Sequence, residues 1–178
     1  LEKIKISPID NAGNKMMMFI LLSFLPLTGM TIDLFSPSLP SISSALGLSD
    51  STTKLVISLY LLGYAFGNFI VGLITDAIGR KTLLRISCLL FIIASILPII
   101  FPNEIVLLSM RFSQGLLIGS IAVINKAIFS DILPTKKLIK LGPTMGLLWG
   151  IGPIIGPILG GYLQHYYGWK SGFYFFSI

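Results

Sequence analysis

Charged residues, histidine and cysteine are scarce in this sequence, and each scarcity excludes a class of protein. Asp, Glu, Lys and Arg make up 11% of the residues, against roughly 25% in an average soluble domain. Cys88 is the single cysteine, which excludes an intrachain disulfide framework and a cysteine metal cluster. His165 is the single histidine, and no set of His, Asp and Glu has metal-ligand or nucleophile spacing. With no phosphate-cradling loop either, the sequence predicts neither an enzyme nor a bound metal or cofactor.

Apolar residues are abundant instead, at 54% of the chain, and they fall in runs of about twenty residues. A bilayer core of roughly 30 Å requires helices of about this length. The expected spans are residues 16–36, 52–75, 83–101, 105–129 and 141–164. The sequence therefore predicts an all-α membrane protein that contacts the lipid bilayer.

A sixth apolar run, residues 169–178, is too short to cross a bilayer. At about 1.5 Å per residue it reaches about half of the hydrocarbon core. The sequence also starts at Leu1 and stops inside this run. We therefore expect the chain to be a fragment or truncated product of a longer protein.

Lysine and arginine are concentrated on alternate connections between the spans. The connections at 36–50 and 101–104 carry neither residue, whereas the N-terminal segment and the connections after the second and fourth spans are basic. The basic residues in question are Lys3, Lys5, Lys15, Arg80, Lys81, Arg85, Lys136, Lys137 and Lys140. Because basic loops stay in the cytoplasm, the N-terminus is expected to be cytoplasmic. The net charge of +6 thus reflects membrane topology, and nucleic acid is not an expected partner.

Asp33 is an ionisable residue inside the first span, in a stretch without other charges. Such a group is costly in a bilayer and usually faces a cavity, which makes it a functional-site hypothesis. One interpretation makes Asp33 a proton carrier. The other places it at the outer interface, where it only caps the following loop.

Arg111 is the second intramembrane charge, about one and a half turns into the fourth span. Gln114 follows it, and the i, i+4 spacing puts Gly115 and Gly119 on the same face as Arg111. Small residues at this spacing predict close helix contact. Packing explains the glycines but not the arginine, which needs an acceptor such as a carboxylate or a carbonyl.

A cluster of glycines and charges marks the inner end of the second span: Gly72, Asp76, Gly79, Arg80 and Lys81. The glycines permit a tight turn and close helix contact, and Asp76 can pair with Arg80 or with a cation of a neighbouring helix. A role in setting membrane topology would be enough to explain Arg80 and Lys81. The spacing of all five residues together indicates a motif.

The fifth span is rich in helix-bending residues: Gly146, Gly150, Gly152, Pro153, Gly156, Pro157, Gly160 and Gly161. Prolines kink a helix, and glycines let another helix pack against the bend. In a transporter this predicts a hinge or a seal, and the alternative is a merely irregular helix.

Polar-tipped residues recur at helical spacing on the second span, at Tyr60, Tyr64 and Asn68. They could line a cavity for amphiphilic ligands or simply pack against another helix. Asn125 and Lys126 lie near the inner end of the fourth span, where a lysine more often extends to the interface than binds a substrate.

Together these elements resemble the major facilitator superfamily, and within it the twelve-helix drug:proton antiporters of the bicyclomycin and chloramphenicol resistance type. Residues 72–81 resemble the signature loop between helices two and three, and 111–115 resemble the helix-four arginine motif. Residues 152–161 are similar to the helix-five antiporter motif, and 33–40 to the helix-one motif of drug exporters.

The resemblance implies that the chain is the incomplete N-terminal six-helix half of a transporter, whose helices one, two, four and five line a central cavity. It implies that Asp33 accepts and releases a proton, while Arg111 holds and tunes that charge. Asp76 and Arg80 would latch the inner face against the missing C-terminal six-helix half, and the fifth helix would resist proton leak. Transport would then follow from rocking one half against the other.

The sequence therefore favours a proton-coupled exporter of small amphiphilic compounds in a bacterial inner membrane, with protons as the coupling ion. Two alternatives stay open. One is a transporter of a specific metabolite, such as a sugar or an amino-acid derivative. The other is a non-transporting membrane fragment that acts as an interaction partner.

Overall fold

Helices make up most of the chain that the computed structural model describes, which is residues 11–178, with side chains described from Met16 onward except at Asp76 and Ala77. The elements are α1 (Asn11–Asp33), the 3-10 helix η1 (Ser36–Ser38), α2 (Leu39–Leu46), α3 (Asp50–Ile78), α4 (Arg80–Ile100), α5 (Glu104–Ile132), α6 (Thr135–Tyr167) and α7 (Ser171–Ser177). Lys3 and Lys5 lie outside the described residues, as do the side chains of Lys15 and Asp76.

Five segments of the described chain are long and apolar enough to cross a membrane. They are Met16–Leu46, Asp50–Thr75, Arg80–Ile100, Glu104–Ile132 and Thr135–Tyr167. The sixth apolar run forms only the short helix α7. The predicted all-α membrane architecture is therefore confirmed.

Large apolar side chains on the outer surface fit this architecture. Leu73, Leu89 and Ile105 are 70%, 62% and 78% exposed. In a membrane these side chains contact lipid tails rather than water, so their exposure carries no hydrophobic cost.

Several helix ends differ from the limits of the apolar runs. The helix α6 begins at Thr135 rather than near residue 141, because the lysine-rich segment between these positions is itself a good helix former. The connection 36–50 is largely helical, since Pro37 and Pro40 occupy the first turns of η1 and α2. A proline there loses no intrahelical hydrogen bond.

Local sequence signals set the two ends of α3. The Ser49 hydroxyl accepts a hydrogen bond from the backbone N–H of Thr52 at 3.1 Å, which caps the start of the helix. Gly79 has a φ of 92° and ends α3 immediately before α4. An L-residue rarely adopts this backbone angle, so the predicted glycine turn is confirmed and its physical reason is clear.

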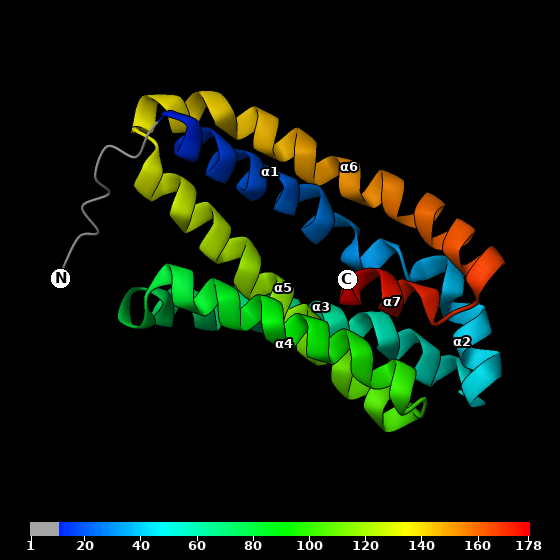
Figure 1. Ribbon diagram of the computed structural model, residues 1–178. Coiled ribbons are helices and arrows are strands. Elements are labelled where there is room, and N and C mark those ends of the chain that lie inside the picture. The colour runs from blue at the N-terminus through cyan, green and yellow to red at the C-terminus, as the bar shows by residue number, and fades with distance from the viewer. Residues whose placement is uncertain (1–10) are drawn as a thin grey trace.

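Two groups of helices make up the structure (Figure 1). The helices α1 and α6 lie side by side, and α3, α4 and α5 form the second group. The helix α5 packs mainly against α3 and α4, and it also contacts α1 and α6. The short helix α7 packs against α4 and α6.

The α3–α5 contact is a reciprocal glycine seam, defined by Gly63 and Gly67 on α3 and by Gly115 and Gly119 on α5. A Cβ atom at Gly63 would lie 2.9 Å from the backbone N of Leu116, and one at Gly115 would lie 2.8 Å from the carbonyl carbon of Tyr60. Real Cβ atoms do not approach this closely, so the seam requires glycine on both helices. The close contact predicted from Gly115 and Gly119 is confirmed.

A second glycine seam joins α1 to α6. The glycines Gly152, Gly156 and Gly160 are buried against α1. A Cβ atom at Gly152 would lie 2.6 Å from the carbonyl oxygen of Pro26. From the other side, a Cβ atom at Gly29 would lie 3.2 Å from Cδ of Pro153. The fifth span therefore does present its glycines to another helix, and that helix is α1.

Some glycines expected to serve close contact do not do so within the described chain. A Cβ atom at Gly72, Gly146 or Gly150 would meet no described atom within 4 Å. Within the described chain these three glycines therefore make no close helix contact, because the seams run along other faces of α3 and α6. Their expected role in packing stays a prediction.

Aromatic rings hold α7 against the end of α1. The ring of Phe173 lies 4.5 Å from that of Phe35, and the ring of Phe176 lies 6.1 Å from Phe35 and 5.8 Å from Phe91. Ring pairs at these separations add about 0.5–1.5 kcal/mol each beyond area burial. Phe35, which lies between α1 and η1, is thus held by two rings of α7.

The glycine seam predicts that Gly115→Ala destabilises the α3–α5 pair. The added methyl group collides with the backbone of α3, and we expect the free energy of unfolding to fall by about 1–3 kcal/mol. Denaturant titration in mixed micelles measures this change. The matched control is Gly150→Ala, whose methyl group meets open space and is expected to leave stability equal or slightly higher. Equal stability of the two variants would contradict the seam.

Candidate functional site

Arg111 is completely buried at the junction of the helices, with 0% of its surface exposed. The carbon Cζ of its guanidinium lies 4.2 Å from the centre of the Phe35 ring and 4.7 Å from that of Tyr60. The Nε–H group donates to the carbonyl of Val56 at 3.4 Å, and Nη1 donates to Oε1 of Gln114 at 3.1 Å. The arginine therefore connects α5 to α3 and to the residue after α1.

Gln114 continues this network to a fourth helix. Its amide Nε2 donates to the hydroxyl of Ser95 at 2.9 Å, and Ser95 donates to the carbonyl of Phe91 at 2.9 Å. Gln114 and Ser95 are both buried on facing helices, α5 and α4. The bond to Ser95 holds the Gln114 amide in place, and the amide oxygen in turn accepts the hydrogen bond from Arg111.

The acceptors of Arg111 are neutral, although the sequence left both a carboxylate and a carbonyl open. Within the described chain Nη2 of Arg111 has no hydrogen-bond partner, and no ion pair joins Arg111 to Asp33. Two ring faces and two polar oxygens hold the charge instead. Desolvated cation–π contacts are worth about 2 kcal/mol or more, which offsets part of the burial cost.

Tyr60 links the same region to α1. Its ring is 3% exposed, and its hydroxyl lies 2.5 Å from the hydroxyl of Thr31. The Thr31 hydroxyl donates to the carbonyl of Thr28, so the Tyr60 O–H is the donor in the bond to Thr31. Tyr60 is therefore a packing residue of the helix junction rather than a cavity-lining one.

Asp33 is the last residue of α1 and is half-buried. A Cβ atom at Gly156 would lie 3.2 Å from Cβ of Asp33, so the first side-chain atom of Asp33 lies beside the glycine seam of α6. In the described chain, no basic side chain pairs with Asp33. The two intramembrane charges are thus held by separate surroundings.

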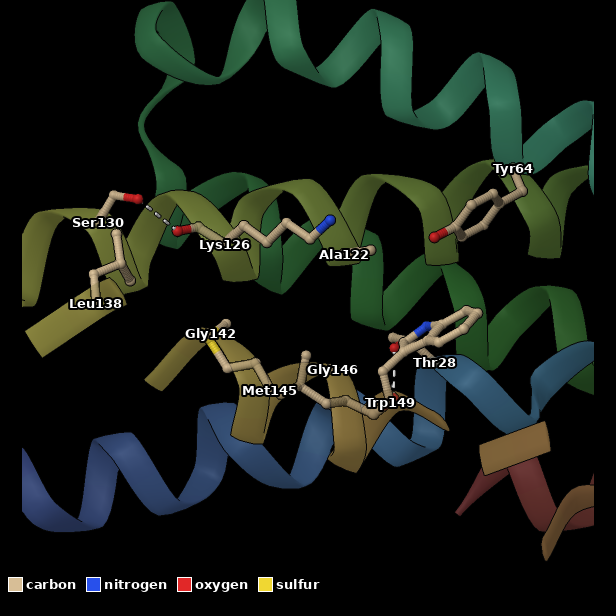
Figure 2. Close-up of a pocket in the computed structure, with 11 residues that line it drawn as sticks. Thr28, Tyr64, Ala122, Lys126, Ser130, Leu138, Gly142, Met145, Gly146 and Trp149 are labelled. Atoms are coloured by element: carbon tan, nitrogen blue, oxygen red, sulfur yellow. Dashed lines mark hydrogen bonds between the residues drawn. The ribbon is translucent and has the colours of Figure 1, made fainter. Parts of the chain in front are cut away.

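A cavity of about 580 Å³ lies between α1, α3, α5 and α6 (Figure 2). Ligand sites for drug-sized molecules have volumes of about 300–1,000 Å³. Its lining residues are Leu25, Thr28, Tyr64, Ala122, Lys126, Ser130, Leu138, Gly142, Met145, Gly146 and Trp149. The lining combines apolar and aromatic surface with a few polar groups, which suits an amphiphilic molecule.

The three polar-tipped residues of the second span have different positions. Tyr64 lines the cavity, and its hydroxyl points into the space in Figure 2. The amide of Asn68 donates to the carbonyl of Tyr64 at 2.8 Å, and a Cβ atom at Gly119 would lie 3.1 Å from Asn68 Nδ2. Tyr64 is the one of the three that the structure places at the cavity.

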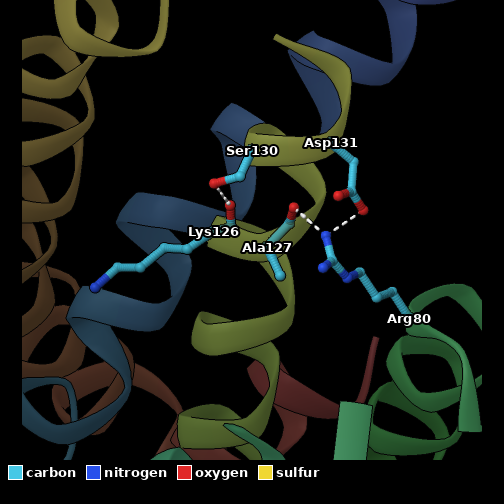
Figure 3. A network of polar contacts seen from close by, with 5 residues as sticks. All are labelled: Arg80, Lys126, Ala127, Ser130 and Asp131. Atoms are coloured by element: carbon cyan, nitrogen blue, oxygen red, sulfur yellow. Dashed lines mark hydrogen bonds and ion pairs between the residues drawn. The ribbon is translucent and has the colours of Figure 1, made fainter. Parts of the chain in front are cut away.

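A polar clamp, formed by Arg80 and Asp131, holds the start of α4 against the end of α5 (Figure 3). Nη1 of Arg80 forms an ion pair with Asp131 and donates to the carbonyl of Ala127 at 2.5 Å. The negative end of the α5 helix dipole also stabilises a cation at this position. The side chain of Asp76, expected to share this motif, is not among the described ones.

Several residues of the site carry no motif and were missed by sequence reasoning. Thr28 and Thr31 sit three residues apart in the first span, and this spacing could have indicated a polar face on α1. Asp131 is an acid beside a lysine-rich connection, which is a weak signal. In the sequence Trp149 is one more apolar residue of its span, because its place in the cavity lining depends on the position of α6.

No group of three His, Cys, Asp or Glu residues in the described part of the chain could hold a metal ion. Residues 19–178 match the Major Facilitator Superfamily. The chain belongs to this superfamily. The superfamily expected from the sequence is thereby confirmed, and membership of a transporter superfamily means that the chain is not an enzyme.

Bacterial relatives are about one-third identical to the chain over the residues that align. It is 32% identical over 142 residues to the uncharacterized MFS-type transporter YdgK of Bacillus subtilis, covering 79% of this chain and 35% of the relative. It is 34% identical over 143 residues to the multidrug resistance protein MdtL of Shewanella oneidensis, covering 80% and 36%. It is 32% identical over 157 residues to MdtL of Vibrio parahaemolyticus, covering 87% and 40%. The chain thus spans 35% to 40% of the length of these superfamily members.

The contacts of Arg111 predict that Arg111→Lys weakens this superfamily member even though the charge is kept. A lysine cannot face two rings while donating to both Val56 and Gln114, and we expect the free energy of unfolding to fall by about 2 kcal/mol. Denaturant titration in mixed micelles again provides the measurement. Arg85→Lys, at an exposed position of α4, is the control and should change stability by less than about 0.5 kcal/mol. A loss no larger than that of the control would contradict the role given to the guanidinium.

Proposed function

We propose that this chain is the N-terminal half of a proton-driven exporter of small amphiphilic compounds. The single observation that carries the proposal is the cavity of about 580 Å³ bounded by α1, α3, α5 and α6. These correspond to helices one, two, four and five, which the resemblance assigns to the central cavity of a transporter. The size and mixed lining of the cavity suit a drug-sized amphiphile.

The names of relatives support export of toxic compounds as the direction of transport. Two relatives that match four-fifths or more of this chain are called multidrug resistance protein MdtL. The relatives extend well beyond the part that this chain matches. In our proposal a second six-helix half completes the cavity, and transport follows from rocking the halves around it.

Asp33 is the proposed proton carrier. It is an ionisable residue within a span, half-buried and without a basic partner in the described chain. Such a carboxylate can gain or lose a proton without breaking an ion pair. Protonation that alternates with substrate binding would couple the proton gradient to export.

The glycines and prolines of α6 support exchange rather than leak. Asp33 stands against Gly156, and the seam formed by Gly152, Gly156 and Gly160 packs this part of α6 closely against α1. A close contact limits the water that could bypass the carboxylate. In the proposed mechanism protons therefore cross only when Asp33 is exposed to each side in turn.

The location we propose is the inner membrane of a bacterium, with the N-terminus and the basic connections in the cytoplasm. The clamp of Arg80 and Asp131 then lies on the cytoplasmic side. With Asp76, it would form the latch that closes this side against the second half during the transport cycle.

The proposal predicts that Asp33→Asn in the complete protein abolishes drug-induced proton release while membrane insertion is unchanged. Asparagine keeps the size of the side chain but cannot carry a proton. The measurement is the pH change on addition of chloramphenicol to energised everted vesicles. Asp33→Glu, which keeps a titratable group, should retain part of the activity.

The matched control is Asp50→Asn, which removes an exposed carboxylate at the start of α3. Its proton release should equal that of the unmodified protein, because the exposed carboxylate affects only the helix dipole, by about 0.3–1 kcal/mol. Undiminished proton release in the Asp33→Asn variant would remove Asp33 from the mechanism.

A further inference from the structure

Lys126 brings a positive charge into the cavity. It lies on α5 two turns before the end of the helix at Ile132. Together with Ala122 and Ser130 it forms one face of α5 at i, i+4 spacing, and all three residues line the cavity. The position of the lysine is therefore part of a continuous cavity wall.

The side chain of Lys126 does not extend toward the nearby end of its helix. In Figure 2 the chain runs along the cavity from its own backbone toward Ala122, away from Ser130 and Leu138. A lysine that reaches for the membrane interface would extend the other way, toward the end of α5. The sequence-based interpretation of Lys126 as an interface lysine is therefore not the arrangement observed.

The ammonium has room around it and no partner. In the described part of the chain, no hydrogen bond or ion pair is made by Nζ, and the clamp carboxylate of Asp131 lies on the other side of α5 (Figure 3). Gly142 and Gly146 face the same space from α6, and a Cβ atom at either would meet no described atom within 4 Å. Because glycine has no side chain, these two positions of α6 leave space beside the ammonium of Lys126.

The rest of the lining complements one kind of molecule. No acidic residue is among the lining residues of the described chain. Trp149 and Met145 supply apolar and aromatic surface, and Tyr64 supplies a hydroxyl. The ammonium of Lys126 would repel an organic cation in this cavity. An organic anion could accept a hydrogen bond from the same ammonium while its apolar body packs against Trp149 and Met145.

We propose that Lys126 makes this cavity select amphiphiles that carry an anionic group, with the carboxylate or sulfonate at Lys126 and the aromatic or aliphatic body against Trp149. The inference rests on the proposed function, since it names the substrate class of the same cavity. Lys126 is exposed in the described chain, and an anion bound to its ammonium would accept a charge-assisted hydrogen bond, which is stronger than a bond between neutral groups. Specificity then comes from one residue of α5 that no motif contains.

The test is direct binding by the complete protein in detergent, measured by equilibrium dialysis with three probes that share one aromatic body. The probes are 4-(4-nitrophenyl)butyrate, the neutral 4-(4-nitrophenyl)butan-1-ol and the cationic 4-(4-nitrophenyl)butylamine, and each is quantified by its absorbance. We expect the butyrate to bind at least about tenfold more tightly than the amine.

Three variants locate the effect. Lys126→Gln should weaken butyrate binding about tenfold and change binding of the neutral alcohol by less than about twofold. Lys126→Arg should keep the preference for the anion, and Gly146→Leu should weaken binding of all three probes by filling the cavity. Lys140→Gln removes an exposed lysine of α6 that does not line the cavity, and it should change nothing.

Equal binding of the three probes by the unmodified protein would overturn the proposal, as would butyrate binding that survives Lys126→Gln. Failure of the proposed function has a different signature. If Asp33→Asn leaves proton release intact while Lys126→Gln weakens butyrate binding, the exporter mechanism is contradicted and the anion site is supported. If proton-coupled export proceeds equally for the butyrate and the amine, with and without Lys126, the mechanism stands and the anion site falls.

Discussion

The buried guanidinium of Arg111 is the constraint on which the arrangement of the other helices depends. A charge that is 0% exposed costs several kcal/mol unless its surroundings satisfy it. Here the satisfaction comes from α3, through Val56 and Tyr60, and from Phe35 after α1. Removing any of these elements would leave the arginine uncompensated, so the charge binds the two helix groups to each other.

The glycine seams make this arrangement possible. Because Gly115 lets α5 approach the backbone of α3 closely, Arg111 one turn earlier reaches the carbonyl of Val56. The seam of Gly152 and Gly160 similarly holds α6 on α1. Between the two tight pairs the surfaces that face each other are less closely packed, and the cavity lies there.

The sequence predicted what depends on one helix and missed what depends on several. The spans, the turn at Gly79 and the shared face of Arg111, Gly115 and Gly119 follow from composition and local spacing alone. The partners of Arg111 could not be predicted this way. Phe35 reaches the guanidinium only because η1 and α7 hold it there, and that requires the tertiary structure.

Lys126 illustrates the same limit from the other direction. Near the end of an isolated helix, the physics of a lysine in lipid favours extension to the interface. The side chain instead runs along the cavity toward Ala122, and Gly142 and Gly146 of α6 leave space there that no local pattern on α5 reveals. In our proposal Gly142 and Gly146 therefore serve the cavity, and their positions could be interpreted only once α6 was placed.

The separation of Arg111 from Asp33 has a consequence for proton coupling. If the arginine were paired with Asp33, protonating the carboxylate would orphan a buried charge and destabilise the helix junction. Since neutral oxygens and ring faces hold the guanidinium, these contacts do not depend on whether Asp33 is charged or neutral. In the proposed mechanism Asp33 alternates between the two states, and this division lets the fold keep its contacts at Arg111 in both of them.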